Sequence, residues 1–297
     1  MTPPRLGLCA LVLLLSLGFV QGDEKSDAAK KQKAVADAML KSAKLTTTHA
    51  ESDDLLVYSS FSEEKTKALA ASAQKTYATG LKALKVAADD KLWPGKLTLI
   101  VLPESRQYKG FVLSALKRSP TNRESFAFEL RSDEPFVLVG TALGEKPTDT
   151  EMITEAAGFV AAAVLNKKAG TGAAGLPEWF MKGFARATHI HADGNAAKAT
   201  AFHAKVKALY AKYRGNGFKP VNVWTNMIAS TETDTVATSF IEYLAFGPEA
   251  EKFPKLIQAM KPTEEVPSPT IATALEAVAW PADGIEAGWK KWIATGK

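Results

Sequence analysis

The sequence predicts an α+β protein, with a small mixed sheet in its first half and a mostly helical second half. Short β-rich runs and one long helical pattern alternate between residues 55 and 139. Beyond residue 148 the apolar residues follow helical spacing, and no strand pattern returns. With 46% hydrophobic residues, the chain is long enough to bury a sizeable core. These observations predict one large globular domain or two subdomains.

The first residues have the features of a secretory signal peptide. Arg5 precedes an apolar run from Leu6 to Val20, which ends in Gln21-Gly22 before a charged stretch. The run is short for a membrane span. We therefore expect residues 1–22 to be cleaved, leaving a secreted or periplasmic protein that begins near Asp23 and has no membrane span. The single cysteine, Cys9, would be removed with them, so no disulfide is expected.

The charge of the mature chain argues against a nucleic-acid partner. Loss of residues 1–22 removes one of 37 basic residues, which leaves 36 against 32 acidic ones and a net charge of +4. These charges alternate in sign and form no basic stripe that could follow a phosphate backbone. The sequence also lacks a phosphate-binding glycine loop, a dinucleotide fingerprint and an Asp-rich calcium loop. We expect no cofactor.

The elements before residue 148 are predicted in chain order. Residues 23–35 are expected to form a frayed helix or solvated arm. Ser60-Phe61-Ser62-Glu63 has the pattern of a capping box, which would begin a helix that runs to about Val86. Period-two alternation or compact β-rich composition predicts four strands, at residues 55–60, 96–102, 126–131 and 136–139.

The second half begins with another capping box. Thr148-Asp149-Thr150-Glu151 would start a helix to about Leu165 that has scarcely a polar side chain after Glu155, as expected of a central, buried helix. A linker is predicted at 169–175, a helix beginning at Pro177, and a surface loop at residues 193–195. We therefore divide the mature chain into an α/β subdomain, 23–170, and a helical subdomain, 171–297.

Two segments of this region resemble the active-site helices of a peptidase family. They are TDTEMITEAAGFVAAAVL, from Thr148, and LPEWFMKGFARAT, from Leu176. Their layout is similar to the helix pair of gluzincin metallopeptidases (peptidase MA-like), which carry HExxH on one helix and a third zinc ligand, Glu, in a WxxEGxA-like turn. Weaker similarity extends through Ser239–Leu244 and Gly247–Glu249 to the last helices.

The resemblance implies a zincin-like fold in which the zinc ligands have been lost. The ligand slots hold Thr154, Gly158 and Lys182, none of which suits zinc, and a protonated lysine would repel a dication. Glu155 occupies the general-base slot, but without a metal it has no activated water to deprotonate. We expect Glu155 to bond a neighbour or to form an ion pair with Lys182.

The resemblance and the signal-peptide pattern together imply a catalytically inactive, exported peptidase-like protein. Its expected partner is an extended peptide or a protein, held at the edge of the sheet where a substrate would lie. Two alternatives remain open. A metal-dependent hydrolase could use relocated ligands, with His189 and His191 on one face of an extended segment and His203 as a third. A structural envelope protein would bind no small ligand.

Overall fold

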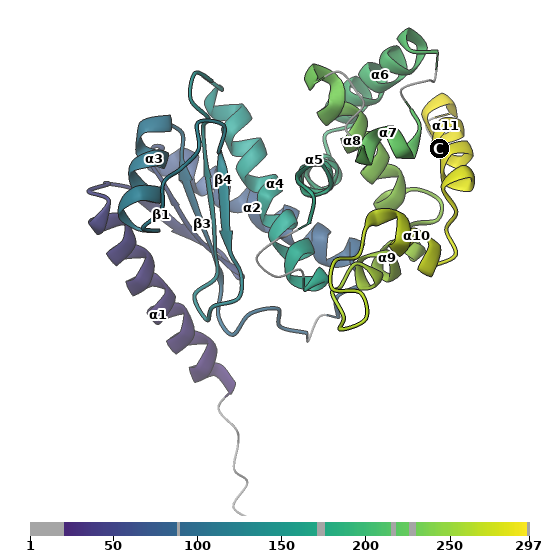
Figure 1. Ribbon diagram of the computed structural model, residues 1–297. Helices are drawn as coiled ribbons and strands as arrows, with labels where there is room; N and C mark the ends of the chain where they lie inside the picture. Colours follow the sequence, from purple (N-terminus) through teal and green to yellow (C-terminus); the bar gives the residue numbers. More distant parts are fainter. Residues whose placement is uncertain (1–20, 88–89, 171–175, 215–217, 226–229, 296–297) are drawn as a thin grey trace, which may run out of the picture.

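The protein is a mixed α+β structure built on one five-stranded sheet. A computed structural model describes residues 21–87, 90–170, 176–214, 218–225 and 230–295 (Figure 1). The proposed signal peptide, apart from its last two residues, lies outside these ranges. None of the helices within the described ranges is long and apolar enough to cross a membrane.

The sheet has parallel strands at its centre and antiparallel strands at its edges. In space the order is β1-β2-β3-β5-β4, with β1 and β4 antiparallel to their neighbours. The strands are β1 (Thr48–Glu51), β2 (Leu55–Ser59), β3 (Leu97–Leu102), β4 (Phe126–Glu129) and β5 (Phe136–Gly140). The four predicted strands are confirmed within one or two residues, whereas β1 was not predicted.

Helices cover both faces of the sheet, so its central strands are buried throughout. Alternate residues such as Val57 and Leu99 point to α2 (Glu63–Ala83) and α4 (Asp149–Ala169). The intervening residues, such as Ile100, pack on α1 (Gln21–Ser42) and α3 (Ser105–Ser114). The sequence did not predict α3. Residues 23–35, expected to be a frayed helix or a solvated arm, belong to α1, a regular helix that buries Leu40.

The helix expected to begin after Ser60 begins two residues later. Ser62 is the N-cap of α2, and its side chain accepts a hydrogen bond from the Lys65 backbone N–H. The Ser60-to-Glu63 capping box is therefore wrong, because Ser60 still bonds to β3 through its backbone N–H. The helix ends at Ala83, three residues before the predicted end.

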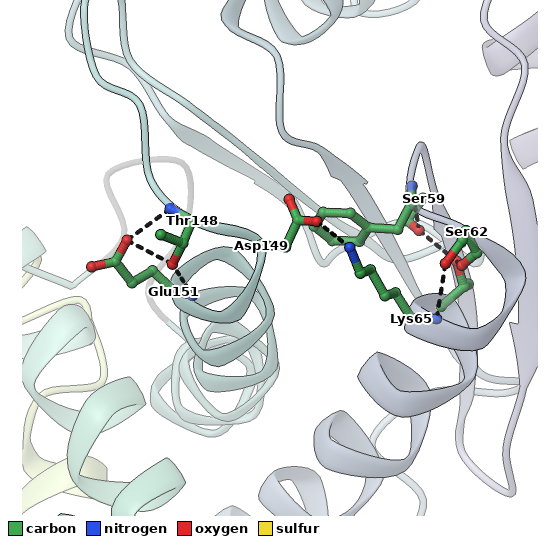
Figure 2. A network of polar contacts seen from close by, with 8 residues as sticks. Ser59, Ser62, Lys65, Thr148, Asp149 and Glu151 are labelled. Atoms are coloured by element: carbon green, nitrogen blue, oxygen red, sulfur yellow. Dashed lines mark hydrogen bonds and ion pairs between the residues drawn. The ribbon is translucent and has the colours of Figure 1, made fainter.

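The predicted capping box of α4 is confirmed. Thr148 accepts a hydrogen bond from the backbone N–H of Glu151, whose carboxylate accepts from the Thr148 backbone N–H at 2.7 Å. Figure 2 shows this box beside an ion pair of 2.5 Å between Lys65 of α2 and Asp149 in the first turn of α4. Both helices therefore begin at the same end of the sheet. Helix α4 ends at Ala169 and is capped by Gly170, whose left-handed backbone suits glycine.

The second half of the described chain is helical. Its helices are α5 (Glu178–Asp193), α6 (Ala196–Lys212), α7 (Pro220–Trp224), α8 (Ser230–Phe246), α9 (Phe253–Ala259), α10 (Ile271–Ala277) and α11 (Ala282–Thr295), with a short 3-10 turn, η1 (Ala250–Lys252), between α8 and α9. Helix α4 is buried at every residue from Ala156 to Leu165 and joins this half to the sheet in one continuous core.

Close helix contacts through small residues hold the centre together. A Cβ on Gly80 of α2 would lie 3.3 Å from the Cβ of Ala161 in α4. One on Gly183 of α5 would lie 3.0 Å from the carbonyl oxygen of Ala237 in α8. The backbones of α2, α4, α5 and α8 therefore approach one another with almost no side chain between them.

Loss of the α4 cap should be measurable. We expect Thr148→Ala to lower the free energy of unfolding by about 1 kcal/mol, because one N-terminal N–H loses its partner. Thr79→Ala is the matched control, since that hydroxyl only bonds back to the Lys75 carbonyl within α2. Chemical denaturation of both variants measures the difference. Equal stability of the two variants would contradict the role of the cap.

Candidate functional site

The four residues singled out by the peptidase resemblance lie on two packed helices, α4 and α5. Gly158 faces α5 directly: a Cβ there would lie 3.0 Å from the Ala185 carbonyl oxygen. Thr154 lies one turn earlier on α4 and is partly buried, as is Lys182, three residues before Ala185. The contact between the two helices therefore lies close to the slots, but it leaves little room for a larger side chain at position 158.

Lys182 is paired within its own helix. Its ammonium lies 2.6 Å from the Glu178 carboxylate, one turn earlier on α5. The expected ion pair with Glu155 is therefore wrong, because Lys182 reaches Glu178 without crossing to α4. The same ammonium lies 5.5 Å from the centre of the Phe126 ring in β4, which brings this charge to the edge of the sheet.

Arg186 and Asp234 complete the group of charges, and neither residue was predicted from the sequence to belong to the site. Arg186 lies one turn after Lys182 on α5, and its guanidinium is 2.6 Å from the carboxylate of Asp234 on α8. The spacing of the two cations on one helix face was visible in the sequence, but the partner from α8 was not. We call Glu155, Glu178, Lys182, Arg186 and Asp234 the charged junction.

Glu155 is the one member of the charged junction without a partner. Within the described residues, no hydrogen bond or ion pair reaches its carboxylate. Burial raises the pKa of the Glu155 carboxyl, and the positive charges of Arg186 and Lys182 only partly offset that effect. The surroundings of Glu155 therefore favour the protonated carboxyl over the ionised carboxylate.

Among the residues that the structure describes, no strand pairs with the outer edge of β4, which lies next to these charges. The backbone N–H of Gly140 donates a hydrogen bond of 2.7 Å to the Ser125 carbonyl. Because the bonded residues alternate along an antiparallel strand, the backbone N–H and C=O groups of Ala127 and Glu129 also point to β5. The N–H and C=O groups of Phe126 and Phe128 therefore point away from the sheet. The Phe126 ring stacks at 4.6 Å on Phe159, one turn after Glu155 on α4. Figure 1 shows β4 at the sheet edge nearest α4 and α5.

The histidines do not form the extended pair that the sequence suggested. His189 and His191 lie in α5 and point in different directions. His189 is buried and bonds through Nδ1 to the Thr76 hydroxyl of α2 at 3.2 Å, and burial lowers the pKa of its imidazole. His191 contacts α8 instead. The prediction of an extended segment is wrong, because the helix continues to Asp193.

His191 and His203 meet at a carboxylate that the sequence analysis did not single out. Each has its Nε2 atom 3.0 Å from Oε1 of Glu242, a residue of α8 with 1% exposure. The signal for Glu242 was its position as the one charge in the apolar run Ser239–Leu244. A nitrogen that donates its proton to this carboxylate cannot at the same time ligate a metal. No group of three His, Cys, Asp or Glu side chains in the part of the chain described here is arranged for a metal ion.

Comparison with known proteins adds no relative. No protein-family model, curated protein or solved structure matches this chain. The gluzincin resemblance therefore remains a hypothesis based on the residues at the slots and on the elements that carry them.

The unpartnered carboxylate predicts a pH-dependent gain in stability. Because the folded-state pKa of Glu155 is raised, its stabilising contribution is present below the unfolded pKa and is lost as the pH rises through the folded one. We expect Glu155→Gln to raise the melting temperature at pH 8 and to change it little at pH 4, where the carboxyl is protonated. Thermal unfolding at the two pH values measures this, and a loss of stability at pH 8 would contradict the account.

The tight contact at Gly158 predicts that an imidazole will not fit there. We expect Gly158→His to lower the free energy of unfolding by about 1–3 kcal/mol, because its side chain would meet the Ala185 backbone. Gly110→His is the matched control: Gly110 also lies inside a helix, but no atom beyond the adjacent backbone of that helix lies within 4 Å of its added Cβ. Chemical denaturation of both variants measures the difference. Equal effects of the two substitutions would show that α4 and α5 can move apart at little cost in stability.

Proposed function

We propose that the protein is an exported, catalytically inactive relative of the gluzincin peptidases, which binds an extended peptide or protein segment along β4. The observation that carries this proposal is the open edge of β4. Its outward-pointing backbone groups are those of Phe126 and Phe128, and the Phe126 ring lies 5.5 Å from the Lys182 ammonium of the charged junction. A peptide that adds to such an edge gains main-chain hydrogen bonds whatever its sequence.

The ligand slots support an inactive protein. Thr154, Gly158 and Lys182 supply neither imidazole nor carboxylate, and zinc-dependent hydrolysis needs such ligands to activate water. Glu155 alone matches the family pattern. A carboxylate at this slot without metal ligands fits a binding role better than a catalytic one.

The zincin-like reading also draws support from the order of elements. An antiparallel edge strand, a parallel strand and a buried helix follow one another as β4, β5 and α4, and α5 then packs on α4. In the proposed arrangement the peptide lies between β4 and the helical half. Export rests on the signal-peptide pattern of residues 1–22.

The alternative with relocated metal ligands loses support. His189 bonds to Thr76 of α2, so it does not join His191 and His203 at Glu242. A structural envelope protein, the other alternative, would select no peptide, and an experiment can measure this difference.

Backbone methylation of a bound peptide tests the proposal. Peptides that bind the mature protein are first selected from a random display library, and each N–H of the best binder is then methylated in turn. Strand addition predicts a loss of about tenfold in affinity at alternate positions, where the N–H faces β4, and little loss between them. Fluorescence anisotropy measures the affinities. Absence of any binder, or losses without alternation, would overturn strand addition.

A further inference from the structure

We infer that the segment bound along β4 carries a lysine or arginine, whose positive head group meets the carboxylate of Glu155. This inference rests on the proposed function, because it concerns a peptide added to the same strand. It adds the chemical class of the side chain that the site prefers.

Within the described ranges, the ion pairs of the charged junction leave one carboxylate, that of Glu155, without a partner. Lys182 is neutralised by Glu178 and Arg186 by Asp234, each at 2.6 Å. Glu155 remains, and the negative charge of Glu145 acts on it as well. The junction therefore attracts a cation and repels an anion, although it contains two basic residues.

The geometry of strand addition directs a peptide side chain toward this carboxylate. In paired strands, directly opposite residues project their side chains to the same face of the sheet. Phe126 projects toward α4, where its ring stacks on Phe159. Glu155 lies one turn before Phe159 on the same side of α4. A peptide residue opposite Phe126 therefore projects its side chain toward α4, on the side that carries Glu155.

The nearby surface suits a long basic side chain. Its methylene groups can pack beside the aromatic rings of β4 while its head group reaches the carboxylate. Glu155 is partly shielded from water, and burial raises its pKa. A bound cation would favour the ionised form of the carboxyl and so offset the desolvation that the free protein tolerates.

A positional peptide library tests the charge preference. Octapeptide pools with random flanks carry lysine, arginine, norleucine or glutamate at one fixed position at a time, and bound peptides are quantified by mass spectrometry. At the preferred position we expect lysine or arginine to be enriched about fivefold over glutamate, the size of a partly exposed ion pair. Glu155→Gln should remove this enrichment.

Glu129→Gln is the matched control. Glu129 lies on the same strand, but alternation places it on the opposite face from Phe126 and Phe128. The Glu129→Gln variant should enrich lysine and arginine as strongly as the unmodified protein does. Binding without a preference for basic residues, or a preference that survives Glu155→Gln, would overturn this inference and leave strand addition standing. Failure of every pool to bind would overturn strand addition itself, and this inference with it.

Discussion

The close approach of four helix backbones determines where the residues of the charged junction lie. Gly158 places α4 against Ala185 of α5, and Gly183 places α5 against Ala237 of α8. With no large side chains between them, the charged residues next to these contacts must share a small volume. This is why Lys182 and Arg186 of α5 act on Glu155, although Glu155 belongs to α4. The same contacts leave little space for a metal ligand at position 158.

Glu155 is held in a place where its charge is disfavoured. A glutamine would fit the same space without the cost of desolvating a charge, so the carboxylate does not serve the stability of the free protein. Residues that reduce stability are often found where they contact a ligand. The open edge of β4, beside this carboxylate, supplies the place where such a ligand would lie.

The sequence predicted the elements whose signals are local. The period-two alternation at Phe126 and Phe128 correctly predicted β4. The Thr148 capping box correctly predicted the residue at which α4 begins. It failed where the outcome depends on distant neighbours. Thr48–Glu51 has no strong strand pattern and forms β1 because it pairs with β2. The predicted ion pair between Lys182 and Glu155 was wrong because Glu178, on the same helix as Lys182, competes with Glu155 on the neighbouring helix. Glu242 was missed because two histidines reach it from α5 and α6.

The proposed function depends on the openness of the β4 edge. Amide hydrogen exchange measured by NMR on the free protein tests this openness most directly. An open edge predicts slow exchange at Ala127 and Glu129, whose N–H groups bond to β5, and fast exchange at Phe126 and Phe128, whose N–H groups point outward. Equal, strong protection of all four amides would mean that this edge is already covered, and it would contradict the account.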